Sequence, residues 1–301
     1  MKLKNSKENL RLSTLIPVAY GSILLFSVLR CFQIVKYIDS ETGFFIGGAW
    51  LEVLLYAAII AVCLGFIIIS YLSSEGKKVE IIPMKDRTAA VASLLFALSL
   101  LYDAVDSLVE GMSIFNGLSV EYFRKAADAI KMLMASGALP YALQGIFALL
   151  SAVYVFILAK SFLNGLANAH NHKLIALAPI GWAAFKMITR FVKQISYIKV
   201  SDLFLELIMI SFMITFFVAL SQVVSGVYSD DSRWRITALG FSGAVLSLLI
   251  NIPRLVLTLL ANGFVNTEYP FSPDDAMFGV FAFAVAVAAV KSATEKGAQS
   301  E

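Results

Sequence analysis

Long apolar runs recur along the chain, and short polar segments separate them. A helix that crosses the hydrocarbon core of a bilayer, about 30 Å thick, needs about 20 mostly apolar residues. Eight runs fit this requirement: 14–35, 50–72, 88–112, 139–162, 174–192, 203–228, 236–260 and 273–290. The pattern predicts an all-α, polytopic membrane protein with eight transmembrane helices.

The last run is the shortest, but it opens with a sequence typical of a helix start. Ser272 can cap a helix, and Pro273 fits the first helical position. The carboxylates of Asp274 and Asp275 complement the positive end of the helix dipole. We therefore expect the final helix to begin at Pro273 and to cross the membrane.

Composition agrees with this prediction and narrows the possible partners. Hydrophobic residues make up 59% of the chain and charged residues 15%, whereas soluble domains average about 45–50% and about 25%. So much apolar surface requires lipid as its solvent. The net charge of +3 is too small to indicate nucleic-acid binding. Cys31 and Cys63 define neither a disulfide framework nor a metal site.

The distribution of Lys and Arg predicts the orientation. If the N-terminus is cytoplasmic, 14 of the 24 Lys and Arg residues fall on inner segments. Cytoplasmic loops carry an excess of these residues. We expect a protein of the plasma (cytoplasmic) membrane with both termini in the cytoplasm.

The longest connection, 113–137, contains a helical pattern over 120–135. Phe123, Ala127, Ile130 and Met134 recur at helical spacing, and charged residues occupy the positions between them. This pattern is typical of a short amphipathic helix. Such a helix lies either in the outer membrane interface or in solvent, packed on the spans.

Two patterns occur in the same order in each half of the chain. Segments 30–38 and 190–198 both read Arg, six residues, Tyr-Ile, and Leu-Ser-Leu-Leu occurs at 98–101 and at 246–249. Between the two patterns, Glu52 and Glu206 begin corresponding spans. We predict a parallel internal repeat of four plus four helices, with halves 1–163 and 164–301. The interface between such halves is the usual place for a transport pathway.

Ionisable residues inside apolar runs are costly and are therefore candidates for function. Arg30, Asp103, Arg190 and Arg254 lie 16–19 residues beyond the basic residue at the inner end of their runs. At 1.5 Å per residue this is roughly 24–28 Å, in the outer third of the membrane core. The Asp274–Asp275 pair begins its helix at the same level. The predicted polar layer comprises Arg30, Glu52, Asp103, Asp106, Glu110, Gln144, Lys186, Arg190, Glu206, Asn251 and Arg254.

Two charged stripes lie within this layer. Asp103, Asp106 and Glu110 share one face of the third span, and Lys186, Arg190 and Lys193 share one face of the fifth. Because the two stripes lie at matching depth and carry opposite charge, we expect them to be partners. The repeat aligns Arg254 with Asp106 and predicts that these two residues pair. The layer is then either a set of ion pairs that clamp the halves together or a polar cavity that binds a solute.

No catalytic constellation is present in the sequence. Gly240-Phe241-Ser242-Gly243 has the form used by rhomboid-type intramembrane serine proteases, which need a histidine on a later helix. The only histidines, His170 and His172, precede the motif. We therefore interpret these small residues as sites of close helix packing. No metal site, cofactor or catalytic residue is predicted, and an enzyme is disfavoured.

Two functions remain open at this point. The first is a carrier or permease for a small polar or ionic solute, with the polar layer as its site. The second is a non-catalytic sensor or an accessory or scaffold subunit, in which the buried charges form structural ion pairs. A water-accessible cavity lined by Asp103, Asp106 and Arg190 favours the first, and closed ion pairs favour the second. The sequence specifies no partner subunit.

Overall fold

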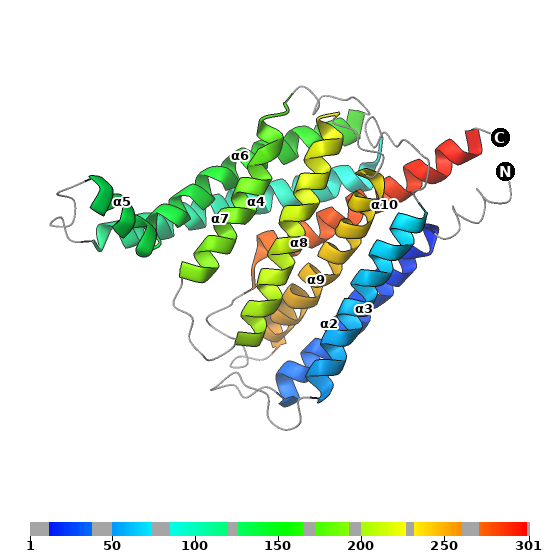
Figure 1. Ribbon diagram of the computed structural model, residues 1–301, viewed down its shortest axis with the longest axis horizontal. Helices are drawn as coiled ribbons and strands as arrows, with labels where there is room; N and C mark the ends of the chain where they lie inside the picture. The colour runs from blue at the N-terminus through cyan, green and yellow to red at the C-terminus, as the bar shows by residue number, and fades with distance from the viewer. Residues whose placement is uncertain are drawn as a thin grey trace.

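The computed structural model describes residues 12–37, 50–73, 85–118, 126–164, 172–192, 200–226, 232–260 and 271–299, and the structural statements below refer to these ranges. Within them the chain is helical and contains no strand (Figure 1). The helices are α2 (Leu15–Tyr37), α3 (Trp50–Leu72), α4 (Arg87–Asn116), α5 (Ala126–Ala135), α6 (Ala138–Asn164), η3 (Ile175–Leu177), α7 (Ala178–Val192), α8 (Val200–Val224), α9 (Ser232–Leu260) and α10 (Pro273–Gln299).

Seven helices are long and apolar enough to cross a membrane: α2, α3, α4, α6, α8, α9 and α10. They coincide with seven of the eight predicted runs, so the chain is an all-α, multi-pass integral membrane protein. The remaining run, 174–192, forms the η3 turn and α7, which has 15 residues. Because α7 is shorter than the roughly 20 residues of a typical span, the eighth crossing stays a prediction.

The outer surface of the bundle is apolar. Leu24, Leu25 and Val28 of α2 and Ile60 and Ile68 of α3 are each at least half exposed. Large apolar side chains gathered on an outer surface mark contact with an apolar partner. These helices therefore present their outer faces to the lipid of the bilayer.

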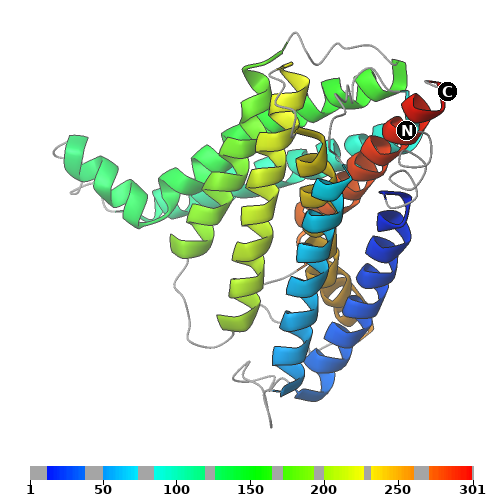
Figure 2. The ribbon, with the colours of Figure 1, turned by 45° about the vertical axis from the view of Figure 1, so that its right-hand side comes forward.

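Helix α9 lies at the centre of the packing, in contact with α2, α3, α8 and α10. The α2–α3 hairpin lies at one edge of the bundle and packs mainly on α9 (Figures 1 and 2). The α4–α6 hairpin packs on α10 through α4 and on α7 through α6. The predicted division into halves 1–163 and 164–301 stays a prediction.

The contact between α9 and α10 depends on glycine. A Cβ atom at Gly240 would lie 2.9 Å from the Ala286 Cβ atom, and one at Gly279 would lie 2.6 Å from Ser247 Oγ. Both distances are shorter than van der Waals contact, so the two helices approach as closely as they do because side chains are missing there. This confirms the packing interpretation for Gly240.

The predicted amphipathic helix is found as α5 over Ala126–Ala135, whereas residues 120–125 lie outside the described ranges. It contacts α6 at the tip of the α4–α6 hairpin, away from the other helices (Figure 1). Both placements of this helix, in the membrane interface or in solvent, stay predictions.

Different helices begin and end at the two ends of the bundle. Helix α2 begins and α10 ends at one end, which we call the terminal end (Figures 1 and 2). At the opposite end α7 and α9 finish and α8 and α10 begin (Figure 1). Polar side chains of these four termini are therefore brought close together.

Candidate functional site

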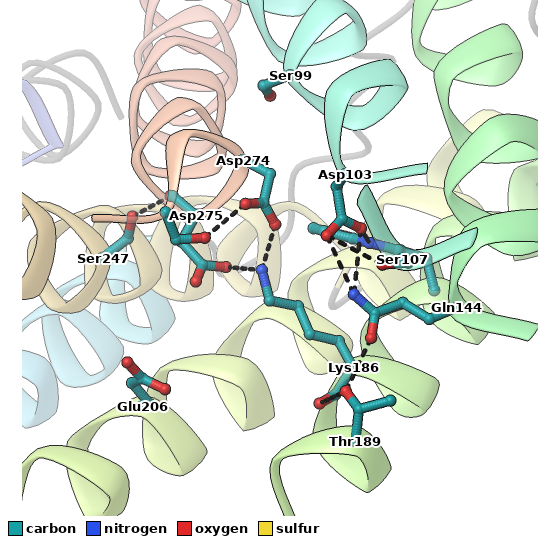
Figure 3. Close-up of polar contacts among 12 residues, drawn as sticks. Ser99, Asp103, Ser107, Gln144, Lys186, Thr189, Glu206, Ser247, Asp274 and Asp275 are labelled. Carbon is teal, nitrogen blue, oxygen red and sulfur yellow. Dashed lines mark hydrogen bonds and ion pairs between the residues drawn. The ribbon is translucent and has the colours of Figure 1, made fainter. Parts of the chain in front are cut away.

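A cluster of buried polar side chains lies just inside the opposite end of the bundle. Gln144, Lys186, Glu206 and Arg254 each lie six residues from the nearer end of their helix, which is about 9 Å of helix. Gln144 contacts Asp103 of α4, and Lys186 contacts the first residues of α10 (Figure 3). Glu206 and Arg254 contact each other, and Glu206 also pairs with Arg190 of α7. We call the residues Asp103, Gln144, Trp182, Lys186, Thr189, Arg190, Glu206, Asn251, Arg254, Asp274 and Asp275 the charged cluster.

Lys186 lies between the two carboxylates that begin α10. Its Nζ atom contacts Asp274 Oδ2 and lies 2.5 Å from Asp275 Oδ1, and all three side chains are at most 4% exposed. Helix α10 begins at Pro273 as predicted, and Ser272 Oγ donates a hydrogen bond to Asp274. The positive end of the helix dipole adds to the attraction from Lys186. Two acidic residues thus share one ammonium group.

Asp103 has a different environment from the other carboxylates. It accepts hydrogen bonds from Trp182 Nε1 at 2.7 Å and from Gln144 Nε2 at 3.1 Å, and Ser107 Oγ lies 3.5 Å away. Each of these donors is neutral. Asp103 is therefore hydrogen-bonded but is not in direct contact with a cation, although it is only 8% exposed.

Thr189 connects Asp103 indirectly to the backbone of α7. Its Oγ1 atom lies 2.8 Å from Gln144 Oε1 and 2.9 Å from the Lys186 carbonyl oxygen. A hydroxyl group has a single proton and can donate to one acceptor at a time. Thr189 can therefore donate either to Gln144 or to the α7 backbone.

Glu206 joins α8 to both neighbouring helices. Its Oε1 atom contacts Arg254 Nη1 of α9, and its Oε2 atom lies 3.2 Å from Arg190 Nε of α7. The second contact is an ion pair whose angles do not make a hydrogen bond. Glu206 is fully buried, and removal of either arginine would leave it with less compensation. Pro253, inside α9, directly precedes Arg254.

Asn251 and Ser247 hold the start of α10 against α9. Asn251 Oδ1 accepts a hydrogen bond of 3.3 Å from the Ser272 backbone N–H, and Ser247 Oγ donates to the Asp275 carbonyl oxygen at 2.5 Å. Both bonds come from one face of α9. The two carboxylates of α10 are thereby placed opposite Lys186.

Aromatic side chains close the cluster on the side of the terminal end. Phe96, two turns before Asp103, packs edge-on against Trp182 with ring centroids 5.9 Å apart. Phe96 also stacks on Phe281 of α10 at 5.1 Å and on Phe217 of α8 at 6.1 Å. All of these rings are at most 1% exposed. The charges are therefore separated from the terminal end by a packed apolar layer.

Four predicted site residues lie apart from this cluster. Arg30 is buried on α2 and donates to Gln33 at 3.1 Å, and Glu52 is half-buried at the start of α3. Asp106 and Glu110 are exposed on α4. Of the predicted acidic stripe, only Asp103 faces the interior.

The predicted pair between Asp106 and Arg254 is wrong. Arg254 contacts Glu206 instead, and Asp106 faces outward. The reason is geometric: a residue three positions along a helix is turned by about 60° from the first, which carries Asp106 off the face that packs on α6 and α10. Lys186 and Arg190 likewise pair with α10 and α8, and Lys193 lies outside the described ranges.

Two apolar grooves are found on the outer faces of the bundle. One of about 240 Å³ lies between α3 and α8, and one of about 320 Å³ lies along α4 and α6. No member of the charged cluster lines either groove. Within the described ranges no group of three or more His, Cys, Asp or Glu residues is placed to hold a metal ion.

Carboxylates from α4, α8 and α10 lie close to cations from α7 and α9 in the interior of the bundle. This arrangement could bind a small ion or allow the ion pairs to exchange partners. No protein-family model, no curated protein and no solved structure matches the chain.

Proposed function

We propose that the protein is a carrier for a small polar or ionic solute and that the charged cluster is its polar site, seen in a closed state. One observation carries the proposal. Among the described residues the cluster contains four carboxylates, Asp103, Glu206, Asp274 and Asp275, but three cations, Lys186, Arg190 and Arg254. Ion pairs that served only to clamp helices would be matched, because unmatched charge in a membrane interior is costly.

The position of the cluster supports the same function. Its side chains come from six helices, α4 and α6 to α10, and its ion pairs connect α7 to α10, α7 to α8 and α8 to α9. Exchange of ionic partners among these helices would change their relative positions. In carriers a polar site near the contact between helix groups is where such changes are coupled to the solute.

We infer that α7 is the eighth crossing and that both termini are cytoplasmic. Helix α6 finishes and α8 begins at different ends of the bundle, and α7 runs between them (Figure 1). An even number of crossings also agrees with α2 beginning and α10 finishing at the same end (Figures 1 and 2). The excess of Lys and Arg then places the terminal end in the cytoplasm. The cluster would face the outer side of the plasma membrane.

The proposed four-plus-four repeat has some support in the packing. Each half would contain two hairpins, α2–α3 with α4–α6 and α7–α8 with α9–α10. The second hairpins, α4–α6 and α9–α10, are the two most extensively packed helix pairs in the described chain. The repeat makes Arg30 equivalent to Arg190 and Glu52 equivalent to Glu206. In the second half, Arg190 and Glu206 form an ion pair.

A thermal-shift screen followed by uptake into proteoliposomes tests the carrier. Purified protein is heated with a library of small polar and ionic solutes, and each stabilising solute is then offered, radiolabelled, to liposomes that contain the protein. Lys186→Gln is compared with Lys160→Gln, because Lys160 is exposed on α6. We expect wild type and Lys160→Gln, but not Lys186→Gln, to be stabilised and to accumulate the solute. Failure of every stabilising solute to enter wild-type liposomes would contradict the carrier.

A second candidate is an accessory or sensor subunit with a purely structural cluster. The observation in its favour is that the ion pairs are closed and the side chains of Lys186 and its two carboxylates are at most 4% exposed. If the cluster is purely structural, the double variant Lys186→Met with Asp274→Leu should still restore the membrane function that is lost in cells lacking the protein. A carrier predicts that the same double variant folds but does not transport.

A further inference from the structure

We propose that Asp103 binds a proton and that the Gln144 amide reverses its hydrogen bonds when this proton binds. Proton binding needs no solute, but its role rests on the carrier proposed above, in which the proton is then the coupling ion. Three features of the cluster lead to this inference: its charge balance, the neutral partners of Asp103 and the symmetry of an amide group.

The charge balance calls for one additional positive charge. With all seven groups ionised, the four carboxylates exceed the three cations by one negative charge. A buried net charge in a membrane is disfavoured, whereas one proton bound to a carboxylate makes the cluster neutral. A proton needs no cavity of its own, unlike a metal ion or an organic cation.

Asp103 is the carboxylate on which this proton belongs. Asp274 and Asp275 both contact the Lys186 ammonium group, and Glu206 lies between Arg190 and Arg254. Each of these three has a direct cationic partner, which favours its ionised form. Asp103 receives hydrogen bonds only from the neutral groups of Trp182, Gln144 and Ser107, so its ionisation gains least from its contacts.

Gln144 can serve both forms of Asp103 because its amide has a donor end and an acceptor end of similar size. In the structure Gln144 Nε2 donates to Asp103 and Gln144 Oε1 accepts from Thr189 at 2.8 Å, which suits an ionised carboxylate. Rotation of the amide by half a turn places its oxygen toward Asp103, where it accepts the carboxylic O–H.

Thr189 completes the reversed arrangement. With the amide rotated, Gln144 Nε2 donates to Thr189 Oγ1, and the Thr189 hydroxyl donates to the Lys186 carbonyl oxygen, 2.9 Å away. Trp182 Nε1 still donates to Asp103 Oδ2 at 2.7 Å. The polar groups of Asp103, Gln144 and Thr189 therefore keep a partner in both states. A change in the protonation of Asp103 on α4 thus alters the hydrogen bonds of Gln144 on α6 and Thr189 on α7 (Figure 3).

The groups around Asp103 determine what loss of the proton does. Tyr141 and Gln144 act on it from α6, Trp182 and Lys186 from α7, and Asp274 from α10. Asp275, Arg190, Glu206 and Arg254 complete the cluster. When the proton passes from the Asp103 carboxyl to water, the ionised carboxylate attracts Lys186, the nearest cation. Lys186 Nζ already lies 5.2 Å from the centre of the Trp182 ring that donates to Asp103. Movement of Lys186 toward Asp103 would weaken the contact of α7 with the start of α10.

Infrared spectroscopy tests the proton directly. The carbonyl stretch of a protonated carboxylic acid is separate from the bands of a carboxylate, and it is measured as a difference between acidic and alkaline buffers in lipid nanodiscs. We expect a protonated-acid band in wild type and in Asp106→Asn, and its loss in Asp103→Asn. Asp106 is the matched control because it lies three residues away on α4 and is exposed. A band that persists in Asp103→Asn, or no band in wild type, overturns the inference.

Thermal stability gives a second measurement. Asn resembles a protonated aspartate in shape and charge, so Asp103→Asn should unfold at the wild-type temperature or above in neutral buffer and should lose the stability change that wild type shows toward alkaline pH. An ionised Asp103 predicts a large fall in Tm instead. The band and the stability profile are independent of uptake. Uptake without the band removes the proton inference, whereas the band without uptake removes the carrier.

Discussion

The Trp182 indole N–H donates a hydrogen bond of 2.7 Å to Asp103 Oδ2, while the same ring packs edge-on against Phe96. One side chain therefore satisfies a buried carboxyl group and closes the apolar layer beside it. Removal of the N–H by Trp182→Phe should cost about 1–3 kcal/mol, because a buried acceptor loses its shortest partner. Thermal unfolding in detergent measures the loss.

Trp234→Phe is the matched control for this substitution. The Nε1 atom of Trp234 is buried and has no hydrogen-bond partner in the described chain, and its ring contact with Tyr71 can be kept by phenylalanine. We expect Trp234→Phe to leave Tm nearly unchanged. Equal losses for the two variants would mean that the bond to Asp103 contributes nothing.

The contacts of Lys186 predict that the stability of the fold depends strongly on its positive charge. Lys186→Met leaves Asp274 and Asp275 buried without their shared cation, and removal of one partner of a buried ion pair costs about 3–5 kcal/mol. Adding Asp274→Asn should restore most of that stability by lowering the uncompensated charge. Lys160→Met, on the exposed face of α6, should have little effect. A double variant no more stable than Lys186→Met would contradict this account.

The corrected pairing makes a prediction opposite to the one that the sequence implied. Asp106 is exposed, and surface substitutions usually change stability by at most about 0.5 kcal/mol. Asp106→Arg should therefore express and unfold as wild type does. Glu206→Gln should be strongly destabilising, because it removes the charge of the buried carboxylate that contacts both Arg190 and Arg254. Expression level and Tm of the two variants decide between the pairings.

Asp86 at the terminal end provides a pH-dependent contribution to stability. It caps α4 through hydrogen bonds from the Thr88 and Ala89 backbone N–H groups, and Lys291 of α10 lies 3.3 Å away. Partial burial would raise the pKa of Asp86, but the hydrogen bond from the Thr88 hydroxyl, the two backbone hydrogen bonds and the Lys291 charge outweigh it and hold the pKa below its usual range. Folding therefore favours the ionised form.

This stability is fully present above the usual pKa of an aspartate and is lost as the pH falls through the lower, folded-state value. Asp86→Ala should cost about 1 kcal/mol at neutral pH, typical of a lost helix cap, and should flatten the acid limb of the stability profile. Asp86→Asn keeps the cap, so it should cost less at neutral pH while flattening the same limb. An unchanged acid limb in both variants would show that Asp86 does not titrate with folding.

Gly279→Ala should separate α9 from the start of α10. The new Cβ atom would lie 2.6 Å from Ser247 Oγ, which donates to the Asp275 carbonyl oxygen. Overpacking of this kind costs about 1–3 kcal/mol. Gly21→Ala on α2 is the control, because a Cβ atom there would meet no neighbouring helix within 4 Å, and alanine in a helix gains about 0.5–1 kcal/mol over glycine. Thermal unfolding of the two variants measures the difference, and equal Tm values would contradict the role of Gly279 in packing.

The sequence predicted where the seven long helices lie, because their positions follow from the lengths of the apolar runs. It did not predict ionic partners. Lys186 was aligned with the acidic stripe of α4, but it pairs with Asp274 and Asp275, because α10 packs on α4 and brings its start between α4 and α9. Which charged residues form ion pairs depends on how the helices pack against one another. The periodicity of residues within a single helix carries no information about that packing.

Two cluster residues were missed although the sequence held a signal for them. Trp182 lies four residues before Lys186 and Thr189 three residues after it, so all three share one face of α7. Extending the basic stripe to its polar and aromatic neighbours would have found both. The shortness of α7 was not foreseen, because the apolar run includes residues 175–177, which form a 3-10 turn instead.

The placement of Pro253 gives α9 a mechanical role. Proline supplies no backbone N–H, so α9 lacks one of its hydrogen bonds immediately before Arg254. The α2–α3 hairpin, whose outer face meets lipid, packs mainly on this same helix. A tilt of the hairpin would therefore act on α9, the helix that carries both this missing hydrogen bond and one of the two arginines paired with Glu206.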